Sequence, residues 1–414
     1  MKKLASLCIL LLLLCISAPC SARAENSYTL LVATDPHFIA PDLTDHGQYF
    51  TALTEKSDGK LMRYSEEIID AFLAEAIAQK PEALLLTGDL TFNGALLSHA
   101  ALAAKLCDAE ASGLRIYVLP GNHDLDNPNA ASFSGAGYTR VPSASPADFR
   151  RIYAPFGFDE ALSVDTDSLS YVVSLHDGTR LLMLDYNTAH DPCGISEKTL
   201  AWVESRLKDA RDAGITMLTA GHQNLFQLTV FRSGYVINNA EKLAALLRQY
   251  GVTLYLSGHL HCQHWMSEQG LTEIATSALS VSPCQYGTLT VTGKALSYET
   301  KETDVAAWAA RRGRTEEDLL HFRQYAADFF DSRNRDGTAE TLSLFSFTPD
   351  EVECMTEYIV KLNRAYFYGD MREAGHFDPT GEIAALFDRS ANLYTAYLAS
   401  VRPDCGMDFR RWNG

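Results

Sequence analysis

Seven side chains in the sequence have the chemistry of metal ligands, and each follows an apolar run. They are Asp35, His37, Asp89, Asn122, His222, His259 and His261. Carboxylate, amide and imidazole donors without thiolates suit borderline divalent metals such as Mn, Fe, Zn or Ni better than a structural zinc site. Seven ligands are too many for one ion, whereas two ions that share a carboxylate fit the number. Paired ions of this kind are a known device for attack on phosphorus.

The turn at residues 120–124 places an amide, an imidazole and a carboxylate on consecutive residues. These are Asn122, His123 and Asp124, which directly follow the apolar run 115–119. Such a turn can also be one whose side chains only bond to their own backbone. Each motif taken alone therefore has an ordinary structural explanation. Five motifs in one chain, each at the end of an apolar run, instead favour a functional site.

The apolar runs and the segments between them predict the elements that position these side chains. Residues 28–34, 83–87 and 115–119 are expected to be buried strands, and residues 63–79 and 98–111 have the apolar spacing of helices. Strands that alternate with helices indicate a largely parallel sheet with helices on its faces. Ligands bind where the strands of such sheets end. The candidate ligands are thus expected on one rim.

The later part of the main domain repeats this alternation. Residues 168–174 and 180–185 are expected to form a hairpin through Asp177 and Gly178. Loops are expected after the first strand, up to about Lys60, and at residues 127–146. The remaining predicted elements are helices at 196–213 and 240–250 and strands at 215–220, 252–256, 272–276 and 286–291.

The composition changes after residue 301. Thr315 and Thr348 each have the character of a helix N-cap with acidic residues behind it, and the apolar positions from Val352 to Tyr366 lie on one helical face. We expect a main domain at residues 25–301 and a helical C-terminal domain at residues 302–414.

Residues 1–24 are expected to be a signal peptide. Lys2 and Lys3 precede the apolar run 4–16, and small residues at 22–24 match a cleavage site. The apolar run is shorter than the roughly 20 residues of a membrane-spanning helix, and no second long run follows. We expect an exported protein without a transmembrane segment in the mature chain; a lipid anchor on Cys20 is the weaker alternative.

The charge balance argues against a polyanionic partner. Without the leader's two lysines and one arginine, 32 basic side chains face 52 acidic ones, a net charge of about −20. Nucleic acid polymers and anionic membranes both favour basic clusters, so neither is expected as the main partner. Six cysteines remain in the mature chain, and their spacing selects no disulfide pairing.

The five motifs, in this order, resemble those of the calcineurin-like metallophosphoesterases over residues 28–300. The resemblance implies an α/β fold, a four-layer α/β/β/α sandwich, here with a C-terminal helical extension. The exported start, the sequence of residues 88–94 and the helical extension are similar to a bacterial secreted branch that resembles the class III cyclic-nucleotide phosphodiesterases. Gly221 and Gln223 depart from the family pattern, because many relatives have a second His or a Pro beside the metal-binding His222.

The resemblance also implies a role for each residue of the motifs. Asp89 would bridge two divalent ions, His123 would protonate the leaving oxygen, and Asp124 would fix the tautomer of His123. The nucleophile would be a hydroxide between the ions. One ion would be held by Asp35, His37 and His261, and the other by Asn122, His222 and His259.

These features predict an exported enzyme that hydrolyses small phosphodiesters, cyclic nucleotides among them. The five motifs contain no Lys or Arg to clamp a monoester dianion, which favours diesters. Asn93 and His123 are the candidate substrate-binding residues; Asn93 has an equally simple role in the turn before Gly94. The alternatives are a phosphomonoesterase or nucleotide pyrophosphatase on the same site and a non-enzymatic extracytoplasmic binding module. The sequence does not indicate the oligomeric state.

Overall fold

A computed structural model of the protein describes residues 27–176, 178–188, 193–372, 381–389 and 393–414. The predicted signal peptide lies outside these ranges, as does Asp177 of the predicted hairpin turn. In the part of the chain that is described, no helix has both the length and the apolar character needed to cross a bilayer.

The first of two large sheets contains the strands that lead to the first three motifs. It has six strands in the order β15-β14-β13-β1-β2-β3. The strands β1, β2 and β3 run parallel, and the strands on the other side of β1 are antiparallel. The bounds are β1 Ser27–Ala33, β2 Ala83–Thr87, β3 Ile116–Leu119, β13 Gln285–Thr292, β14 Ala295–Glu302 and β15 Arg411–Asn413.

The second sheet carries the last two motifs. It has seven strands in the order β11-β12-β10-β9-β8-β7-β6, with β8, β9, β10 and β12 parallel. The bounds are β6 Ser163–Val164, β7 Tyr171–His176, β8 Thr179–Leu184, β9 Thr216–Gly221, β10 Leu254–Ser257, β11 His264–Glu268 and β12 Leu271–Ala275.

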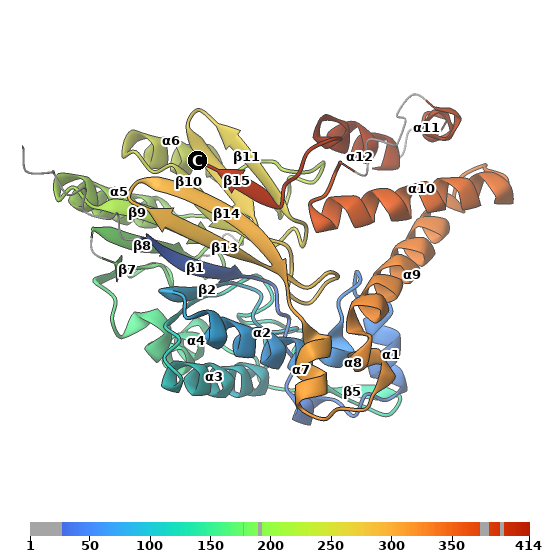
Figure 1. The fold of residues 1–414 in the computed structure, drawn as a ribbon, viewed down its shortest axis with the longest axis horizontal. Helices are drawn as coiled ribbons and strands as arrows, with labels where there is room; N and C mark the ends of the chain where they lie inside the picture. The colour runs from blue at the N-terminus through green and yellow to red at the C-terminus, as the bar shows by residue number, and fades with distance from the viewer. Residues whose placement is uncertain (1–26, 177, 189–192, 373–380, 390–392) are drawn as a thin grey trace, which may run out of the picture.

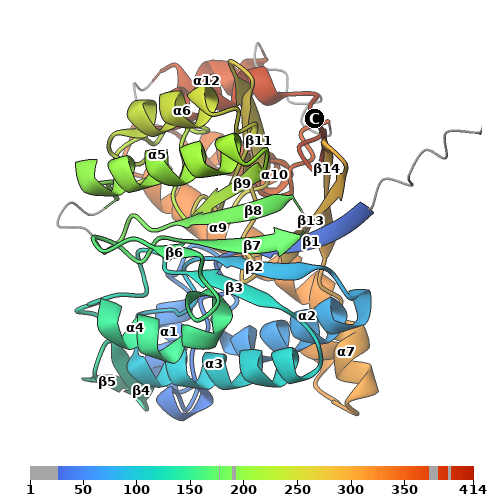
Figure 2. The same ribbon diagram turned by 90° about the vertical axis from the view of Figure 1, so that its left-hand side faces the viewer.

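The two sheets pack face to face between layers of helices, which is the predicted four-layer α/β/β/α arrangement (Figures 1 and 2). Helices α2 (Ser65–Gln79) and α3 (Leu96–Ala111) cover the first sheet, and α5 (Glu197–Asp212) and α6 (Ala240–Gln249) cover the second (Figure 2). Strands β2 and β3 are buried along their whole length and β1 is buried from Leu30 to Ala33, which explains their continuous apolar sequences. The fold class expected from the sequence is confirmed.

Two segments that we predicted to be loops contain regular structure. The first holds helix α1 (Gln48–Thr54), and the second holds a hairpin of β4 (Ala131–Ser134) and β5 (Gly137–Arg140). The prediction of plain loops was wrong because both elements are too short to show a clear apolar periodicity. Phe133 of the hairpin packs on Phe50 of the helix at a ring distance of 5.6 Å, so each element stabilises the other.

The C-terminal region begins with helices and ends in the first sheet. Its long helices are α9 (Phe322–Leu342) and α10 (Pro349–Tyr368), and β15 pairs with β14 at the sheet edge. Trp308 of α7 lies in the same apolar core as the first sheet, so this region is packed onto the main domain. The remaining helices are α7 Val305–Arg311, α8 Glu317–Leu320, α11 Glu382–Phe387 and α12 Leu393–Val401.

Candidate metal centre

The carboxyl ends of strands from both sheets meet, and backbone hydrogen bonds join the turns that follow them. The amide of Asp35 donates to the carbonyl of Gly88 at 3.0 Å, and the amide of Gly258 donates to the carbonyl of His222 at 3.0 Å. Glycine is required at position 88, where φ is +102° and a Cβ would lie 2.5 Å from Nδ1 of His222. The motifs are thus fixed by contacts between backbones rather than by flexible side chains.

Five of the seven proposed ligands have a left-handed backbone conformation. Such conformations cost non-glycine residues roughly 1–3 kcal/mol each and concentrate at functional sites. They let a side chain at a strand end turn towards its neighbours. The residues and their φ values are Asp35 at 52°, His37 at 43°, Asp89 at 48°, His259 at 68° and His261 at 60°.

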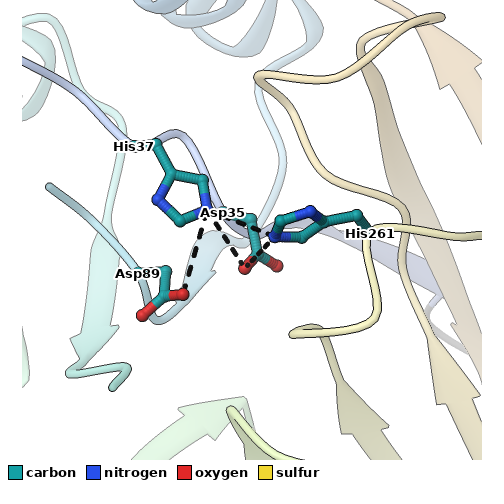
Figure 3. A group of neighbouring side chains, drawn as sticks. All are labelled: Asp35, His37, Asp89 and His261. Carbon is teal, nitrogen blue, oxygen red and sulfur yellow. Dashed lines mark hydrogen bonds and ion pairs between the residues drawn. The ribbon is translucent and has the colours of Figure 1, made fainter. Parts of the chain in front are cut away.

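One group of four side chains forms the first candidate ion site (Figure 3). Nε2 of His37 lies 3.2 Å from Nε2 of His261 and 3.8 Å from Oδ1 of Asp35. Nε2 of His261 lies 3.3 Å from the same oxygen of Asp35, and Nε2 of His37 lies 3.8 Å from Oδ2 of Asp89. Donor atoms at these separations fit around one ion whose bonds are about 2.0–2.2 Å long.

A second group shares Asp89 with the first. Nε2 of His222 lies 3.3 Å from Oδ2 of Asp89 and 3.2 Å from Oδ1 of Asn122. His259 completes the group, with one ring nitrogen within 4.8 Å of the other donors. The structure therefore brings all seven predicted ligand residues together in two groups.

The two carboxylate oxygens of Asp89 have different surroundings. Oδ1 accepts a hydrogen bond from the backbone amide of His123 at 2.8 Å. Oδ2 is directed to His37 on one side and to His222 on the other. The first bond fixes the orientation of the carboxylate, and the second oxygen would be available to cations held on either side.

Two of the imidazoles are oriented by hydrogen bonds to backbone carbonyls. Nδ1 of His222 donates to the carbonyl of Thr87 at 2.9 Å, and Nε2 of His259 donates to the carbonyl of Gly234 at 2.9 Å. Each bond fixes the tautomer and leaves the other ring nitrogen with its lone pair for a metal. This donor arrangement is the usual one at imidazole–metal sites.

The residues fit a pair of cations on electrostatic grounds as well. Oδ1 of Asp35, which faces Nε2 of His37 and of His261, is buried without a hydrogen-bond partner. Burial would raise the pKa of Asp35, yet His261 and His222 hold it below its usual range. Burial would lower the pKa of His222, but the carboxylates of Asp89 and Asp35 raise it to about 9, so without metal a proton occupies the nitrogen that a cation would take. An ionised carboxylate with an unpartnered oxygen inside the protein is a strong site for a cation.

The structure changes the role predicted for Asp124. Nδ1 of His123 donates to the backbone carbonyl of Phe92 at 2.7 Å, and this bond fixes the tautomer of the ring. The carboxylate of Asp124 is fully buried and accepts hydrogen bonds from the amides of Gly121 and Leu90 at 2.8 and 2.9 Å. Asp124 does not orient His123, because the carboxylate of Asp124 bonds to these amides and Nδ1 of His123 bonds to Phe92. It fixes the turn instead.

Asn93 is not placed as predicted either. Its Nδ2 donates to the carbonyls of Asn129 and Ala131, each at 3.3 Å, and its side chain is buried. Both bonds attach the β4 hairpin to the turn after β2. The amide group is therefore committed to the fold, and the prediction that it donates to a phosphate oxygen was wrong.

Gln223, one of the departures from the family pattern, connects two of the motifs. Its Nε2 donates to Oδ1 of Asn187 at 2.6 Å, and Nδ2 of Asn187 donates to the carbonyl of Pro120 at 3.1 Å. The turn that holds His222 is thereby linked to the turn that holds His123.

Sequence reasoning missed Lys60, the one basic residue that we associate with the site. Its backbone pairs with Val281, and the following amide, of Leu61, donates to the carbonyl of Ser280 at 2.7 Å. Ser280 in turn donates from Oγ to the carbonyl of Asp35 at 2.7 Å. Lys60 is 7% exposed and forms no ion pair with any described residue. The pKa of His37 lies well below its ordinary value. Burial is the main cause, and the positive charge of Lys60 is the second.

Glu273 was also missed. This fully buried residue of β12 accepts hydrogen bonds from the amides of Leu225 and Phe226 at 3.0 and 2.6 Å and from Oγ of Ser257 at 2.7 Å. The carboxylate of Glu273 thus stabilises both the segment that follows His222 and the segment that precedes His259. A lone Glu in a strand carries no sequence signal for this role.

Comparison with known proteins agrees with this centre. A family model described as calcineurin-like phosphoesterase matches residues 28–263, more than half of the chain. The chain belongs to the calcineurin-like phosphoesterases. A second model, described as the C-terminal domain of cyclic nucleotide phosphodiesterase, matches residues 304–408.

Solved structures with similar folds are distant in sequence. A dimetal phosphatase from Danio rerio is 13% identical, with a TM-score of 0.47, and the alignment covers 67% of this chain and 96% of that one. The structure of PhoD is 11% identical, with a TM-score of 0.41, and covers 66% of this chain and 65% of that one. No curated protein matches the sequence.

Proposed function

We propose that this calcineurin-like phosphoesterase is an exported phosphodiesterase that hydrolyses small phosphodiesters, cyclic nucleotides among them. The observation that carries the proposal is the position of His123 beside Asp89. Nε2 of His123 lies 3.9 Å from the oxygen of Asp89 that both ion sites share, and the His123 side chain is 32% exposed. An imidazole that is near the metal donors and open to solvent can reach both the site and an incoming substrate.

The ligands form two sets, which would bind two divalent ions of the Mn, Fe or Zn type. Asp35, His37 and His261 would hold one ion, and Asn122, His222 and His259 the other. Asp89 would contact both and offset their mutual repulsion. When bound, such ions neutralise phosphate charge and make water a nucleophile near neutral pH.

His123 is the residue that can move a proton. The carbonyl of Phe92 can only accept, so Nδ1 carries a hydrogen in every state of the ring. In the imidazolium form the second hydrogen is on Nε2, which faces the site. Transfer of that proton to the departing oxygen would neutralise the alkoxide as the P–O bond breaks.

Lys60 is the specific observation in favour of the phosphomonoesterase alternative. Lys60 is 7% exposed and has no carboxylate partner among the described residues, so an anion bound near its ammonium would gain from this charge. A phosphate dianion would gain more from this charge than a diester with one negative charge. The motifs themselves contain no basic residue, and the C-terminal match is to a domain of a cyclic nucleotide phosphodiesterase, so the diester is our first choice.

A substrate panel tests the proposal. Purified protein supplied with Mn²⁺ is assayed on a phosphomonoester, a linear diester, and 3′,5′- and 2′,3′-cyclic nucleotides. The proposal expects the highest kcat/KM on a diester. A clear preference for the monoester would establish the alternative instead. Less than about one bound ion per chain and no hydrolysis of any substrate would favour a binding module.

A further inference from the structure

Two aromatic rings lie next to the metal centre without a role in the proposed chemistry. Phe231 and Tyr235 stack with their centroids 5.4 Å apart and their planes 26° apart. Tyr235 is also in ring contact with His259, at 5.0 Å. Phe231 is 41% exposed, so the pair extends from a metal ligand outwards to the solvent.

The loop that presents these rings is attached to the metal centre. The carbonyl of Gly234, between the two aromatic residues, accepts the hydrogen bond from Nε2 of His259 at 2.9 Å. The amide of Tyr235 closes a turn with the carbonyl of Arg232 at 3.2 Å, and the amide of Phe231 donates to Oγ1 of Thr229 at 3.0 Å. The position of the ring pair is therefore coupled to the ligand itself.

A second contact supports the loop from the C-terminal region. The hydroxyl of Tyr366, on helix α10, donates to the carbonyl of Leu228 at 2.9 Å. Tyr366 is buried, and its helix starts from a capping box at Thr348. The aromatic pair is thus held from both sides although its outer ring is exposed.

We infer that Phe231 and Tyr235 form a stacking site for the nucleobase of a nucleotide substrate. The inference rests on the proposed function, because it gives that site a substrate class. Phe231 stacks on Tyr235 and is 41% exposed, so its ring offers apolar surface on which a purine or pyrimidine can lie. Stacking on an aromatic side chain accepts any base, since every base has a π-face.

The order of the ring contacts, from His259 to Tyr235 and from Tyr235 to Phe231, favours a nucleotide over an aryl ester. Tyr235 is in contact with His259, whereas Phe231 is one ring further out. In an aryl ester the ring is attached directly to the phosphoester oxygen and would remain near the ions. In a nucleotide a ribose separates the base from the phosphate, so the base can reach Phe231.

The substitution Phe231→Ala, with Phe231→Trp as the conservative variant, tests the stacking site. The substrates are 3′,5′-cyclic AMP and the methyl riboside 3′,5′-cyclic phosphate, which lacks a base. Aromatic stacking on a base corresponds to roughly 5- to 100-fold in affinity. We expect Phe231→Ala to lower the ratio of the two kcat/KM values by about this factor and Phe231→Trp to restore it. Leu344→Ala removes another exposed apolar side chain, 80% exposed and outside the site, as the matched control.

A second measurement does not depend on turnover of a nucleotide. Adenosine should inhibit hydrolysis of a nitrophenyl diester competitively, with a Ki that rises in Phe231→Ala and is unchanged in Leu344→Ala. An unchanged ratio and an unchanged Ki, in an enzyme that hydrolyses diesters, would overturn the stacking site alone. An enzyme that hydrolyses no diester would overturn the proposed function itself.

Discussion

Nδ1 of His123 lies 2.7 Å from the backbone carbonyl oxygen of Phe92, and this single bond determines which nitrogen of the ring faces the metal centre. Because a backbone carbonyl does not titrate, the orientation of the ring is independent of pH. The second nitrogen, Nε2, is thereby left on the side of the ring that faces the carboxylate of Asp89.

His123→Ala should therefore have effects that depend on the leaving group. General-acid help is typically worth about 10²- to 10⁴-fold. We expect a loss of this size on a cyclic nucleotide, whose alkoxide needs a proton, and a much smaller loss on a nitrophenyl diester. Steady-state rates and metal analysis of the same preparation check this. Equal losses on both substrates with full metal content would exclude the acid role, and a fall in metal content would make His123 a ligand.

Lys60→Met should lower kcat/KM for a phosphomonoester by about 10- to 100-fold, the usual worth of a hydrogen bond to a charged group. The loss on a diester should be smaller because its phosphate carries one charge less. Lys56→Met, in the same segment but exposed, is the control and should behave as the wild type. A loss that is the same for monoester and diester would show that Lys60 supports the fold rather than the phosphate.

The left-handed backbone conformation of the ligands predicts that a glycine variant at such a position is more stable than the alanine variant. At position 261, where φ is 60°, glycine avoids the cost of a left-handed Cβ, so metal-free His261→Gly should be more stable than His261→Ala by about 1 kcal/mol. His222 is outside the left-handed region, and there the order should be reversed. Urea unfolding in a chelator checks both pairs. A more stable alanine variant at position 261 would contradict this account of strain.

The positions of the ligands could be predicted from the sequence because each is adjacent to a strong apolar run. A run predicts a strand, parallel strands end on one side, and the residue types at their ends define the chemistry. Lys60 and Glu273 could not be found in this way. The first is placed by pairing with Val281 and the second by reaching the segment after His222, and such distant contacts leave no local pattern.

The roles predicted for Asp124 and Asn93 were wrong because nearness in sequence was taken to mean a shared role. Asp124 is adjacent to His123 in sequence, which suggested contact, but the two successive side chains bond to different neighbours. Asn93 follows the Gly88–Asp89 motif closely, yet its amide is used by the β4 hairpin, which the sequence did not reveal.

Glu273 should make stability depend on pH. Burial, only partly offset by its hydrogen bonds, raises its pKa from an ordinary 4.5 to about 7. The folded state therefore holds a proton that the unfolded state has lost between these values. This contribution is greatest below pH 4.5 and is lost as the pH rises to about 7, with a total on the order of 3 kcal/mol.

Unfolding of the metal-free protein in urea from pH 4.5 to 8 measures this dependence. The difference in stability between the wild type and Glu273→Gln should change across this window and be constant above it. Glu268→Gln, at an exposed position of the neighbouring strand β11, is the control and should show no such change. A difference that is flat from pH 4.5 to 7 would mean that Glu273 is ionised throughout.

The shared carboxylate of Asp89 is the centre of the whole account, and counting bound metal in Asp89→Asn tests it most directly. The wild type should hold about two ions per chain. The asparagine variant keeps the shape but loses the charge that offsets repulsion between the ions, so it should retain one ion or none and lose activity more completely than His261→Ala, which removes a ligand of one ion. An Asp89→Asn protein that holds two ions and still hydrolyses its substrate would contradict the account.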